Sequence, residues 1–358
     1  FFCIFIATTF SGCWSRMEPK NLSIVNSALW DIIADGNYQL TKEILSLPGS
    51  SGGKGGEEKS TKILIGKGKT PAEAARDDLS GKSVFGGNLK VRLFTEKLAK
   101  IGTLPILDFF SRDHITDETP FIVVVRGEDP QRIYSSVTGL SNVVGDYIED
   151  LSKTQPKIKS QAVFITSFEF IKEFYAVGKQ PVAGLVEIQK NDAKDYGSSM
   201  SGGQDAQDNS QGEYKLVYAG LAAFKDDKLV GYMDATETRA YNFITNRMKG
   251  TVISLPDGQS ALKVLKSKSS MKADIENGQV AISVNLTAVL SDIEADPNID
   301  LKDIDCFKRV EAGFNKQLEK EILASVQKAQ QEFRSDIFGF GISLHIQHPR
   351  EWKQLQEN

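Results

Sequence analysis

The chain has 358 residues, 40% of them apolar and 25% charged, which suits two or three domains with ordinary hydrophobic cores. Its 43 Lys and Arg against 47 Asp and Glu give a formal net charge of -4, which argues against a general nucleic-acid binder. Its three cysteines and three scattered histidines argue against a disulfide framework or a zinc site, so we expect no metal and no cofactor.

The first element in chain order is an apolar leader, residues 1–10, which has the length of the apolar region of a signal peptide. It ends in Phe10-Ser11-Gly12-Cys13, which resembles the bacterial lipobox because an apolar residue and two small residues precede the cysteine. We therefore expect residues 1–12 to be a signal peptide and Cys13 to carry lipid. No initiator Met or basic segment precedes the leader, so we expect the sequence to be truncated at its start.

An ordinary cleaved signal peptide, with Cys13 unmodified, is the alternative to lipidation. In the lipidated form, two or more acyl chains hold a protein stably on a bilayer, and residues 13–20 would be the tether. Trp14 would lie among the lipid headgroups, as interfacial tryptophans do. Beyond the leader no apolar run reaches the roughly 18 residues that a membrane-spanning helix needs, so any anchor is expected at the front.

Strands and helices alternate in the predicted N-terminal domain, residues 21–190. Strands are expected at 23–33, 38–45, 90–95 and 121–126, and helices at 71–80, 96–101, 107–113, 133–151 and 164–176. This alternation favours a mixed α/β layer. The helix at 164–176 carries an apolar stripe that we expect to lie in the core, formed by Phe164, Ile165, Phe168, Ile171, Phe174 and Tyr175.

Two glycine-rich segments invite comparison with phosphate-binding loops. Residues 48–56 lack the Gly-Lys-Ser/Thr ending, and residues 63–70 have an isoleucine where a Walker A loop needs glycine. Thr70, Pro71 and Glu73 instead predict the start of a helix, with Thr70 as N-cap and Glu73 closing a capping box. We therefore expect a hairpin extension and a helix start, without a nucleotide.

Residues 191–212 contain Gly, Ser, Asp, Asn and Gln with almost no apolar residue, which predicts a linker or mobile loop before a C-terminal domain, 213–358. Strands are expected there at 214–224, 229–233, 251–255, 260–269, 279–287 and 342–347, and helices at 237–247 and 303–334. The long helix has apolar residues at three- and four-residue steps, so it should pack one stripe on a sheet; a partner-groove helix is the alternative. These residues are Phe307, Val310, Phe314, Leu318, Ile322, Val326 and Phe333.

Several segments, in order along nearly the whole chain, resemble the Ger(x)C lipoproteins, the C subunits of spore germinant receptors. They are residues 12–18 around the lipobox cysteine, 222–231, the lysine–serine segment 266–272, 327–341 and 348–353. Two departures are Ser15, where the family usually has Asp, and residues 26–31, which replace a glycine-containing strand. Neither departure removes the expected anchor.

The resemblance implies a non-enzymatic subunit of the spore inner membrane that is lipid-anchored, with its ectodomain on the outer face. It implies integral-membrane A and B subunits as partners in sensing small nutrients and starting germination. The implied fold is α/β (α+β mixed), with several mixed β-sheets each flanked by helices, in three sheet-centred domains. Because the chain stops at Asn358, short of a terminal strand that the family usually has, we expect the last sheet to lack that strand.

The segment 336–341 is the most recognisable part of the resemblance. Its glycines suit tight turns or bulges beside a strand. The functional alternative is contact with a partner, for which Phe338, Phe340 and Trp14 are the candidates. A solute-binding lipoprotein that captures the nutrient itself is the rival function. A hydrolase of spore cortex is a third class, but no catalytic residue is expected, since no catalytic triad order or paired-carboxylate motif stands out.

Overall fold

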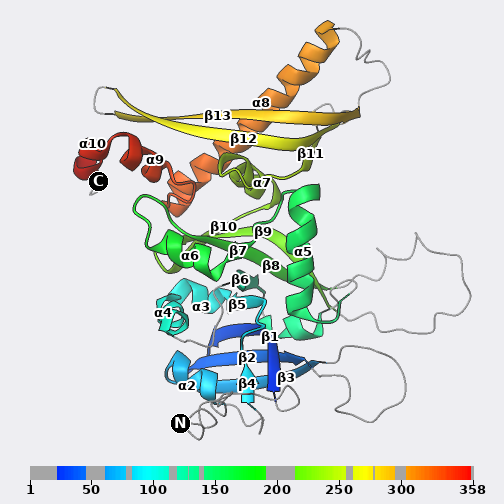
Figure 1. The fold of residues 1–358 in the computed structure, drawn as a ribbon, viewed down its shortest axis with the longest axis vertical. Coiled ribbons are helices and arrows are strands. Elements are labelled where there is room, and N and C mark those ends of the chain that lie inside the picture. The colour runs from blue at the N-terminus through cyan, green and yellow to red at the C-terminus, as the bar shows by residue number, and fades with distance from the viewer. Residues whose placement is uncertain are drawn as a thin grey trace, which may run out of the picture.

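The computed structural model describes residues 22–45, 61–77, 83–112, 119–127, 129–136, 141–190, 214–254, 261–276, 279–294 and 304–355. Cys13, Trp14 and the predicted linker 191–212 lie outside these residues. The described part is an elongated molecule in which a large sheet and a small sheet follow one another along the long axis (Figure 1). None of its helices is long and apolar enough to span a membrane.

Among the described residues, ten strands form the larger sheet, in the order β10-β9-β8-β6-β5-β1-β2-β3, with β4 beside β1 and β7 beside β6. Strands β1, β5, β6 and β8 run parallel in the middle, and antiparallel strands flank them. The strands are β1 (Leu22–Ile32), β2 (Tyr38–Leu45), β3 (Thr61–Gly68), β4 (Ser83–Phe85), β5 (Val91–Thr95), β6 (Phe121–Arg126), β7 (Ile165–Thr166), β8 (Val182–Lys190), β9 (Tyr214–Lys225) and β10 (Lys228–Met233).

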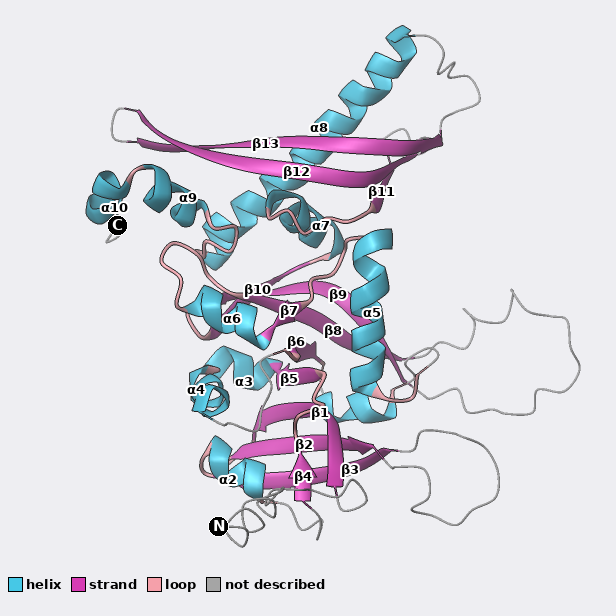
Figure 2. Ribbon diagram, in the orientation of Figure 1, coloured by secondary structure: helices cyan, strands magenta, loops and turns pink. Residues whose placement is uncertain are grey.

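Helices cover both faces of the larger sheet, as Figure 2 shows. One face packs against α2 (Pro71–Arg76), α3 (Glu96–Ile101), α4 (Leu104–Arg112) and α6 (Ser167–Phe174), and the other against η3 (Pro130–Ser135) and α5 (Val144–Ile158). Because successive strand residues point to opposite faces, Trp30 lies in the first core and Leu29 in the second, each at most 1% exposed. This double cover explains the near-continuous apolar runs of the central strands.

The smaller sheet is the antiparallel set β11 (Thr251–Ser254), β12 (Ala261–Glu276) and β13 (Gln279–Glu294). Its inner face packs on α7 (Ala235–Ile244) and on the long helix α8 (Ile304–Lys328). Phe314 and Leu318, each 4% exposed, lie in this third core with Leu262 and Val264 of β12. The apolar stripe of the long helix therefore faces a sheet, as predicted, although Phe307 is 44% exposed.

The last part of the chain contains η4 (Ala329–Phe333), α9 (Phe340–Gln347) and α10 (Pro349–Leu355). The prediction of a strand at 342–347 is wrong, because these residues are helical. The apolar residues Ile342, Leu344 and Ile346 alternate in sequence, which is typical of a strand, but Leu344 is 5% exposed and Ile346 72% exposed. The capping of this helix, described below, explains why these residues are helical.

Two predictions in the N-terminal half were also wrong. The single helix expected at 133–151 is replaced by the short η3 and by α5, which begins only at Val144. The aromatic stripe expected at 164–176 has the wrong phase, because Phe168 is 56% exposed and Tyr175 72% exposed, whereas Phe170 is fully buried. The residues before α6 form β7, which shifts the face that the helix buries.

The mixed α/β fold expected from the sequence is confirmed. Its described part contains two sheets with helices against them, where the resemblance implied three sheet-centred domains. Strands β8 and β9, which precede and follow the predicted linker, pair antiparallel from Val182↔Ala223 to Lys190↔Tyr214. The larger sheet thus extends across the boundary drawn between residues 21–190 and 213–358.

Candidate functional site

Helix α8 loses regular α-helical geometry just before the segment 336–341. Ala329–Phe333 form one turn of π-helix, and Arg334 follows in the left-handed region with φ 49. A left-handed non-glycine residue costs about 1–2 kcal/mol, and π turns and strained residues are frequent at functional sites. We therefore treat residues 329–341 as the candidate site.

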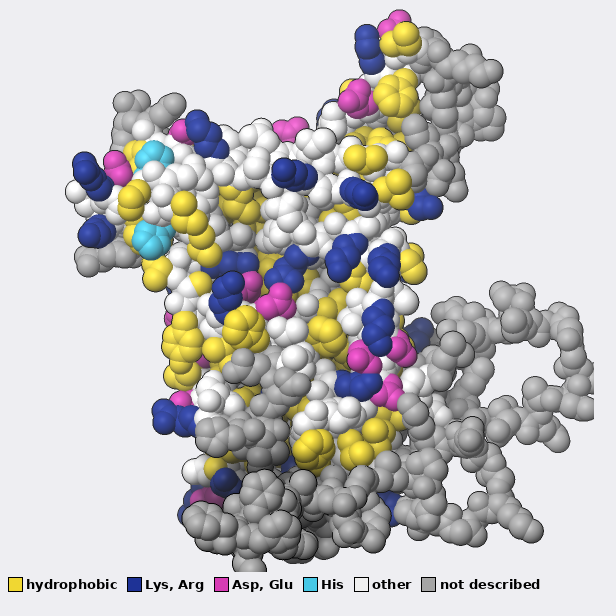
Figure 3. Space-filling view, in the orientation of Figure 1, with side chains coloured by type: hydrophobic (Ala, Val, Ile, Leu, Met, Phe, Trp, Pro, Cys, Tyr) yellow, Lys and Arg dark blue, Asp and Glu magenta, His cyan; other side chains and the backbone are white. Residues whose placement is uncertain are grey.

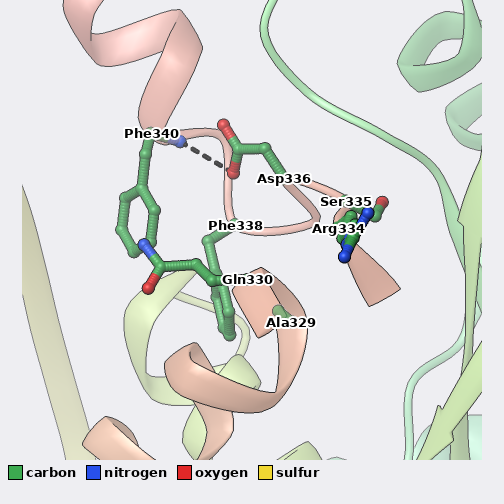
Figure 4. Close-up of a pocket in the computed structure, with 7 residues that line it drawn as sticks. All are labelled: Ala329, Gln330, Arg334, Ser335, Asp336, Phe338 and Phe340. Atoms are coloured by element: carbon green, nitrogen blue, oxygen red, sulfur yellow. Dashed lines mark hydrogen bonds between the residues drawn. The ribbon is translucent and has the colours of Figure 1, made fainter. Parts of the chain in front are cut away.

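Asp336 begins the turn that leads from the π turn into α9. Its carboxylate accepts hydrogen bonds from the backbone amides of Gly339, Phe340 and Gly341 at 2.8, 3.1 and 2.7 Å. Figure 4 shows the bond from Phe340. Amides at the start of a helix have no acceptor within it, so the carboxylate supplies one. Burial raises the pKa of the Asp336 carboxyl, although the amide hydrogen bonds oppose the rise.

The segment docks against the loop that follows α6. The amide of Gln180 donates to the carbonyl oxygen of Asp336 at 2.8 Å, and the amide of Ile342 donates to that of Gly178 at 3.0 Å. Gly178 has φ 81, and a Cβ atom on it would lie 2.5 Å from the carbonyl carbon of Gly341. The close approach of these two backbone segments thus requires glycine at 178.

Two aromatic rings from the segment stack beside each other. The ring of Phe338 lies 5.3 Å from that of Phe340 at 26° and 5.8 Å from that of Tyr241. Phe338 is only 3% exposed, so it is a core residue, which corrects the prediction that it contacts a partner at the surface. Phe340 is partly buried and keeps part of its ring accessible.

A pocket of about 310 Å³ opens beside these rings. It is lined by Ala329, Gln330, Arg334, Ser335, Asp336, Phe338 and Phe340. Figure 4 shows Gln330, Phe338 and Phe340 together, with Arg334 and Ser335 apart from them. The side chains of Gln330 and Arg334 are exposed and have no hydrogen-bond partner in the described part of the chain. The pocket thus offers aromatic surface, an amide and a guanidinium to an occupant.

A cluster of charged residues holds the elements next to the segment in place. Lys179 forms an ion pair with Glu173 at 2.6 Å, and Arg247 lies 3.8 Å from the same carboxylate and 3.3 Å from Glu169. Burial lowers the pKa of Lys179, but Tyr241 and Glu173 raise it, and the net shift is upward. These charges pair with one another and so position α6 against the residues that follow α7, although one carboxylate oxygen of Glu173 is buried without a hydrogen-bond partner.

The other residues flagged from the sequence lie elsewhere or outside the described part. Residues 63–70 form β3 and the start of α2, where Thr70 accepts from the Glu73 amide at 3.2 Å, as predicted. Glu73 accepts from the amide of Lys69 rather than of Thr70, so the predicted capping box is wrong by one residue. The described residues contain no group of three or more side chains that could hold a metal ion. Cys13 and Trp14 have no described structure.

Sequence reasoning missed Gln330, Arg334 and Asp336 as site residues. The N-cap of α9 is Gly339, and Asp336 lies three residues before it, so its contact with the first amides does not follow the usual N-cap pattern. The π turn could not be predicted either, because residues 303–334 show an uninterrupted helical pattern.

Two protein-family models match the chain in order. "Spore germination protein N-terminal domain" matches residues 15–188, and "Spore germination B3/ GerAC like, C-terminal" matches residues 219–358. The chain is 25% identical to spore germination protein B3 of Bacillus subtilis (strain 168), over 98% of this chain and 90% of that protein. It is 25% identical to spore germination protein A3 and 23% identical to spore germination protein KC of the same organism, over 99% and 97% of this chain and 90% and 86% of those proteins.

A solved structure has the same fold. The crystal structure of the GerBC protein superposes with a TM-score of 0.54 at 21% identity, covering 92% of this chain and 90% of that chain. The likeness supports the mixed α/β architecture.

Proposed function

Because the chain belongs to the GerAC-like family of spore germination proteins, we propose that it is the C subunit of a nutrient germinant receptor, without catalytic chemistry of its own. The observation that carries the proposal is the continuous match to spore germination protein B3, over 98% of this chain and 90% of that protein. In this proposal the subunit acts with integral-membrane A and B subunits to start germination.

The proposed anchor is lipid on Cys13, which holds the ectodomain on the outer face of the spore inner membrane. The lipobox-like residues before Cys13 support it, and Trp14 would lie among the headgroups. In cells that lack the A and B subunits, a Cys13→Ala variant placed behind an ordinary cleavable signal peptide should be released from the membrane fraction by a high-salt wash, whereas the wild-type protein should remain. Attachment of this variant that persists at high salt would show that lipid on Cys13 is not what holds the protein.

The proposed contact with a partner subunit is the surface at residues 329–341. Its backbone is fixed by the Asp336 cap and by the close approach to Gly178, so it presents the accessible part of Phe340 in one geometry. Gln330 beside Phe340, and Arg334 elsewhere in the pocket lining, are free to bind acceptor groups of a partner. An aromatic anchor with polar neighbours is typical of the energetic centre of a protein interface.

Affinity isolation from spore membranes tests this function. The tagged wild-type protein should co-purify the A and B subunits, and Phe340→Ala should reduce their recovery. Phe307→Ala is the matched control, since Phe307 is an exposed phenylalanine near the start of α8, more than twenty residues before the site. Recovery of the wild-type protein without these subunits would contradict the proposal.

A second candidate function, direct capture of a nutrient, is supported by the pocket of about 310 Å³. Pockets of this size that combine aromatic surface with a few polar groups are typical of small-molecule sites. Calorimetry of the purified protein with amino acids and sugars separates the two functions. Tight binding that is lost in Arg334→Ala would favour nutrient capture over a scaffold.

A further inference from the structure

The lysine–serine segment lies in β12, where its side chains alternate between two faces. Lys266, Lys268 and Ser270 are exposed on the outer face of the smaller sheet, whereas Ser269 points inward and is 6% exposed. Lys266 pairs with Val289 of β13 and Lys268 with Thr287, so the neighbouring outer positions are aliphatic or neutral. The segment therefore places the ammonium groups of Lys266 and Lys268 on the outer face of the sheet.

Further lysines extend this group onto the end of α5. The hydroxyl of Thr251 donates to the carbonyl oxygen of Lys159 at 2.7 Å, and a Cβ on Gly250 would lie 2.2 Å from that of Lys157. The end of α5 is thus in contact with the start of β11. Figure 3 shows Lys and Arg side chains over both α5 and the β12–β13 hairpin on one face. The basic face is defined as the exposed side chains of Lys157, Lys159, Lys249, Lys263, Lys266 and Lys268.

Most of these charges are not neutralised within the described part of the molecule. Among its residues, Lys157, Lys159, Lys249, Lys266 and Lys268 form no ion pair. Two carboxylates in the region have other cations, Asp274 with Lys272 at 2.8 Å and Glu169 with Arg247 at 3.3 Å. A concentration of positive charge on a chain of net charge -4 is a segregated field that attracts anions.

Ordinary structural roles account for only part of the basic face. Lys157 and Lys159 lie at the C-terminal end of α5, where cations are stabilised by the helix dipole. That effect does not reach β12, since sheets have only small net dipoles. Lysines also protect the edges of sheets from pairing, and beyond Val264 β12 is an edge strand, because β11 pairs only with Ala261–Val264. Edge protection therefore accounts for charge at Lys266 and Lys268, but not for the exposed aliphatic side chains beside them.

Exposed aliphatic side chains lie among these lysines. Val252 is 49% exposed and pairs with Lys263, and Val289 is 52% exposed and pairs with Lys266. The bulge between Val264 and Lys266 turns Leu265 outward, where it is 42% exposed. Aliphatic groups surrounded by cations match the boundary between the headgroups and the acyl chains of a bilayer.

We propose that the basic face binds the surface of an anionic lipid bilayer. A soluble polyanion would leave the aliphatic side chains in water, and an acidic protein surface would more often meet an aromatic anchor than a group of lysines. Each lysine near an anionic membrane contributes about 1 kcal/mol, and the aliphatic groups add hydrophobic burial. This inference goes beyond the proposed function, because an anchor at Cys13 requires no particular face to meet the membrane.

Vesicle sedimentation tests the proposal on the mature chain made without its leader, so that Cys13 receives no lipid. We expect binding to phosphatidylcholine vesicles that contain phosphatidylglycerol, little binding to pure phosphatidylcholine, and loss of binding at high salt. Lys266→Ala with Lys268→Ala should weaken binding about 30-fold, which corresponds to about 2 kcal/mol for two lysines.

The control is Lys62→Ala with Lys67→Ala, two exposed lysines on β3 at the opposite end of the molecule (Figure 1), which should bind as wild type. If both pairs of substitutions weakened vesicle binding equally, net charge alone would explain the effect, and the proposal would be overturned. So would equal binding to charged and neutral vesicles. Binding to a soluble polyanion or to acidic protein, without binding to anionic vesicles, would overturn the bilayer as the partner.

Discussion

The guanidinium of Arg239 in α7 donates two hydrogen bonds to the carboxylate of Glu321 in α8, at 2.8 and 2.7 Å. Their side chains are 9% and 7% exposed, so the pair is largely withdrawn from water. Helix α7 directly follows β10 of the larger sheet, and α8 packs against the smaller sheet. The pair therefore joins the elements that connect the two sheets, across 82 residues of sequence.

We predict that Glu321→Ala lowers the free energy of unfolding by about 3–5 kcal/mol, because it leaves the Arg239 charge buried and unpaired. Replacing both residues together, by Arg239→Met and Glu321→Leu, should cost less than the single change, since no unpaired charge remains. Denaturant unfolding measures both. The control is Asp108→Ala, which breaks the exposed Arg112–Asp108 pair and should cost no more than about 1 kcal/mol. Equal losses in the buried and exposed pairs would contradict the account.

Gly178→Ala should destabilise the protein more than Gly36→Ala does. Both glycines have φ 81, so the two substitutions share the cost of a left-handed alanine, about 1–2 kcal/mol. A Cβ on Gly36 meets nothing within 4 Å, whereas one on Gly178 lies 2.5 Å from the Gly341 carbonyl carbon. The difference in unfolding free energy between the two variants therefore measures the close approach alone. No difference would show that the segment 336–341 does not dock as described.

The carboxylate of Asp336 accepts from the first amides of α9, although Gly339 is the N-cap residue, so Asp336→Ala should cost about 0.5–2 kcal/mol, the range for removing a side chain that satisfies such amides. Asp336→Asn keeps one oxygen for the amides of Gly339 and Phe340, which share Oδ1, but loses the acceptor for Gly341, so it should cost less than Asp336→Ala. Thermal or denaturant unfolding would rank the three proteins. Identical stability of the alanine variant and the wild type would mean that the carboxylate does not cap α9.

Glu43 predicts a pH dependence of stability. It lies on β2, is 1% exposed, and accepts from the Val144 amide at 3.0 Å and the Ser27 hydroxyl at 2.7 Å. Burial raises the pKa of Glu43 above its ordinary value of 4.5 despite these hydrogen bonds. The folded state thus binds more protons than the unfolded state just above pH 4.5, so this contribution to stability is present at lower pH and is lost as the pH rises through the folded-state pKa.

Denaturant unfolding of Glu43→Gln across this pH range checks the prediction. The variant lacks the titrating group, so its stability should fall less than that of the wild type as the pH rises from about 4.5 to neutral. Glu319→Gln, on an exposed position of α8, should keep the wild-type dependence. If the stability of Glu43→Gln depended on pH as that of the wild type does, the raised pKa of Glu43 would be contradicted.

Local patterns were sufficient for much of the fold. The hairpin of β1 and β2, the helix Glu96–Ile101 closed by Gly102, and the long helix up to its π turn follow from alternation, a glycine at a positive φ and helical spacing. Each of these signals lies within the element itself, so these elements could be predicted from the sequence alone.

The failures concern elements whose form depends on distant residues. Helix α5 begins at Val144 because Glu43, 101 residues earlier, accepts from its first amides, and no local side chain caps it. Strands β12 and β13 were expected to end near residues 269 and 287, but their pairing continues to Glu276 and Glu294 because each supplies the other's partner groups. For the candidate site, the segment was found from the resemblance, whereas its pocket depends on the left-handed Arg334.

The central claim is that this chain acts in nutrient-triggered germination, and the most direct measurement is the germination of spores that lack it. We predict that such spores lose the response to at least one amino acid or sugar to which the parent spores respond. Expression of the wild-type chain should restore that response, and the chain with Gly178→Ala should restore less of it. Unchanged germination with every nutrient that triggers the parent spores would contradict the account.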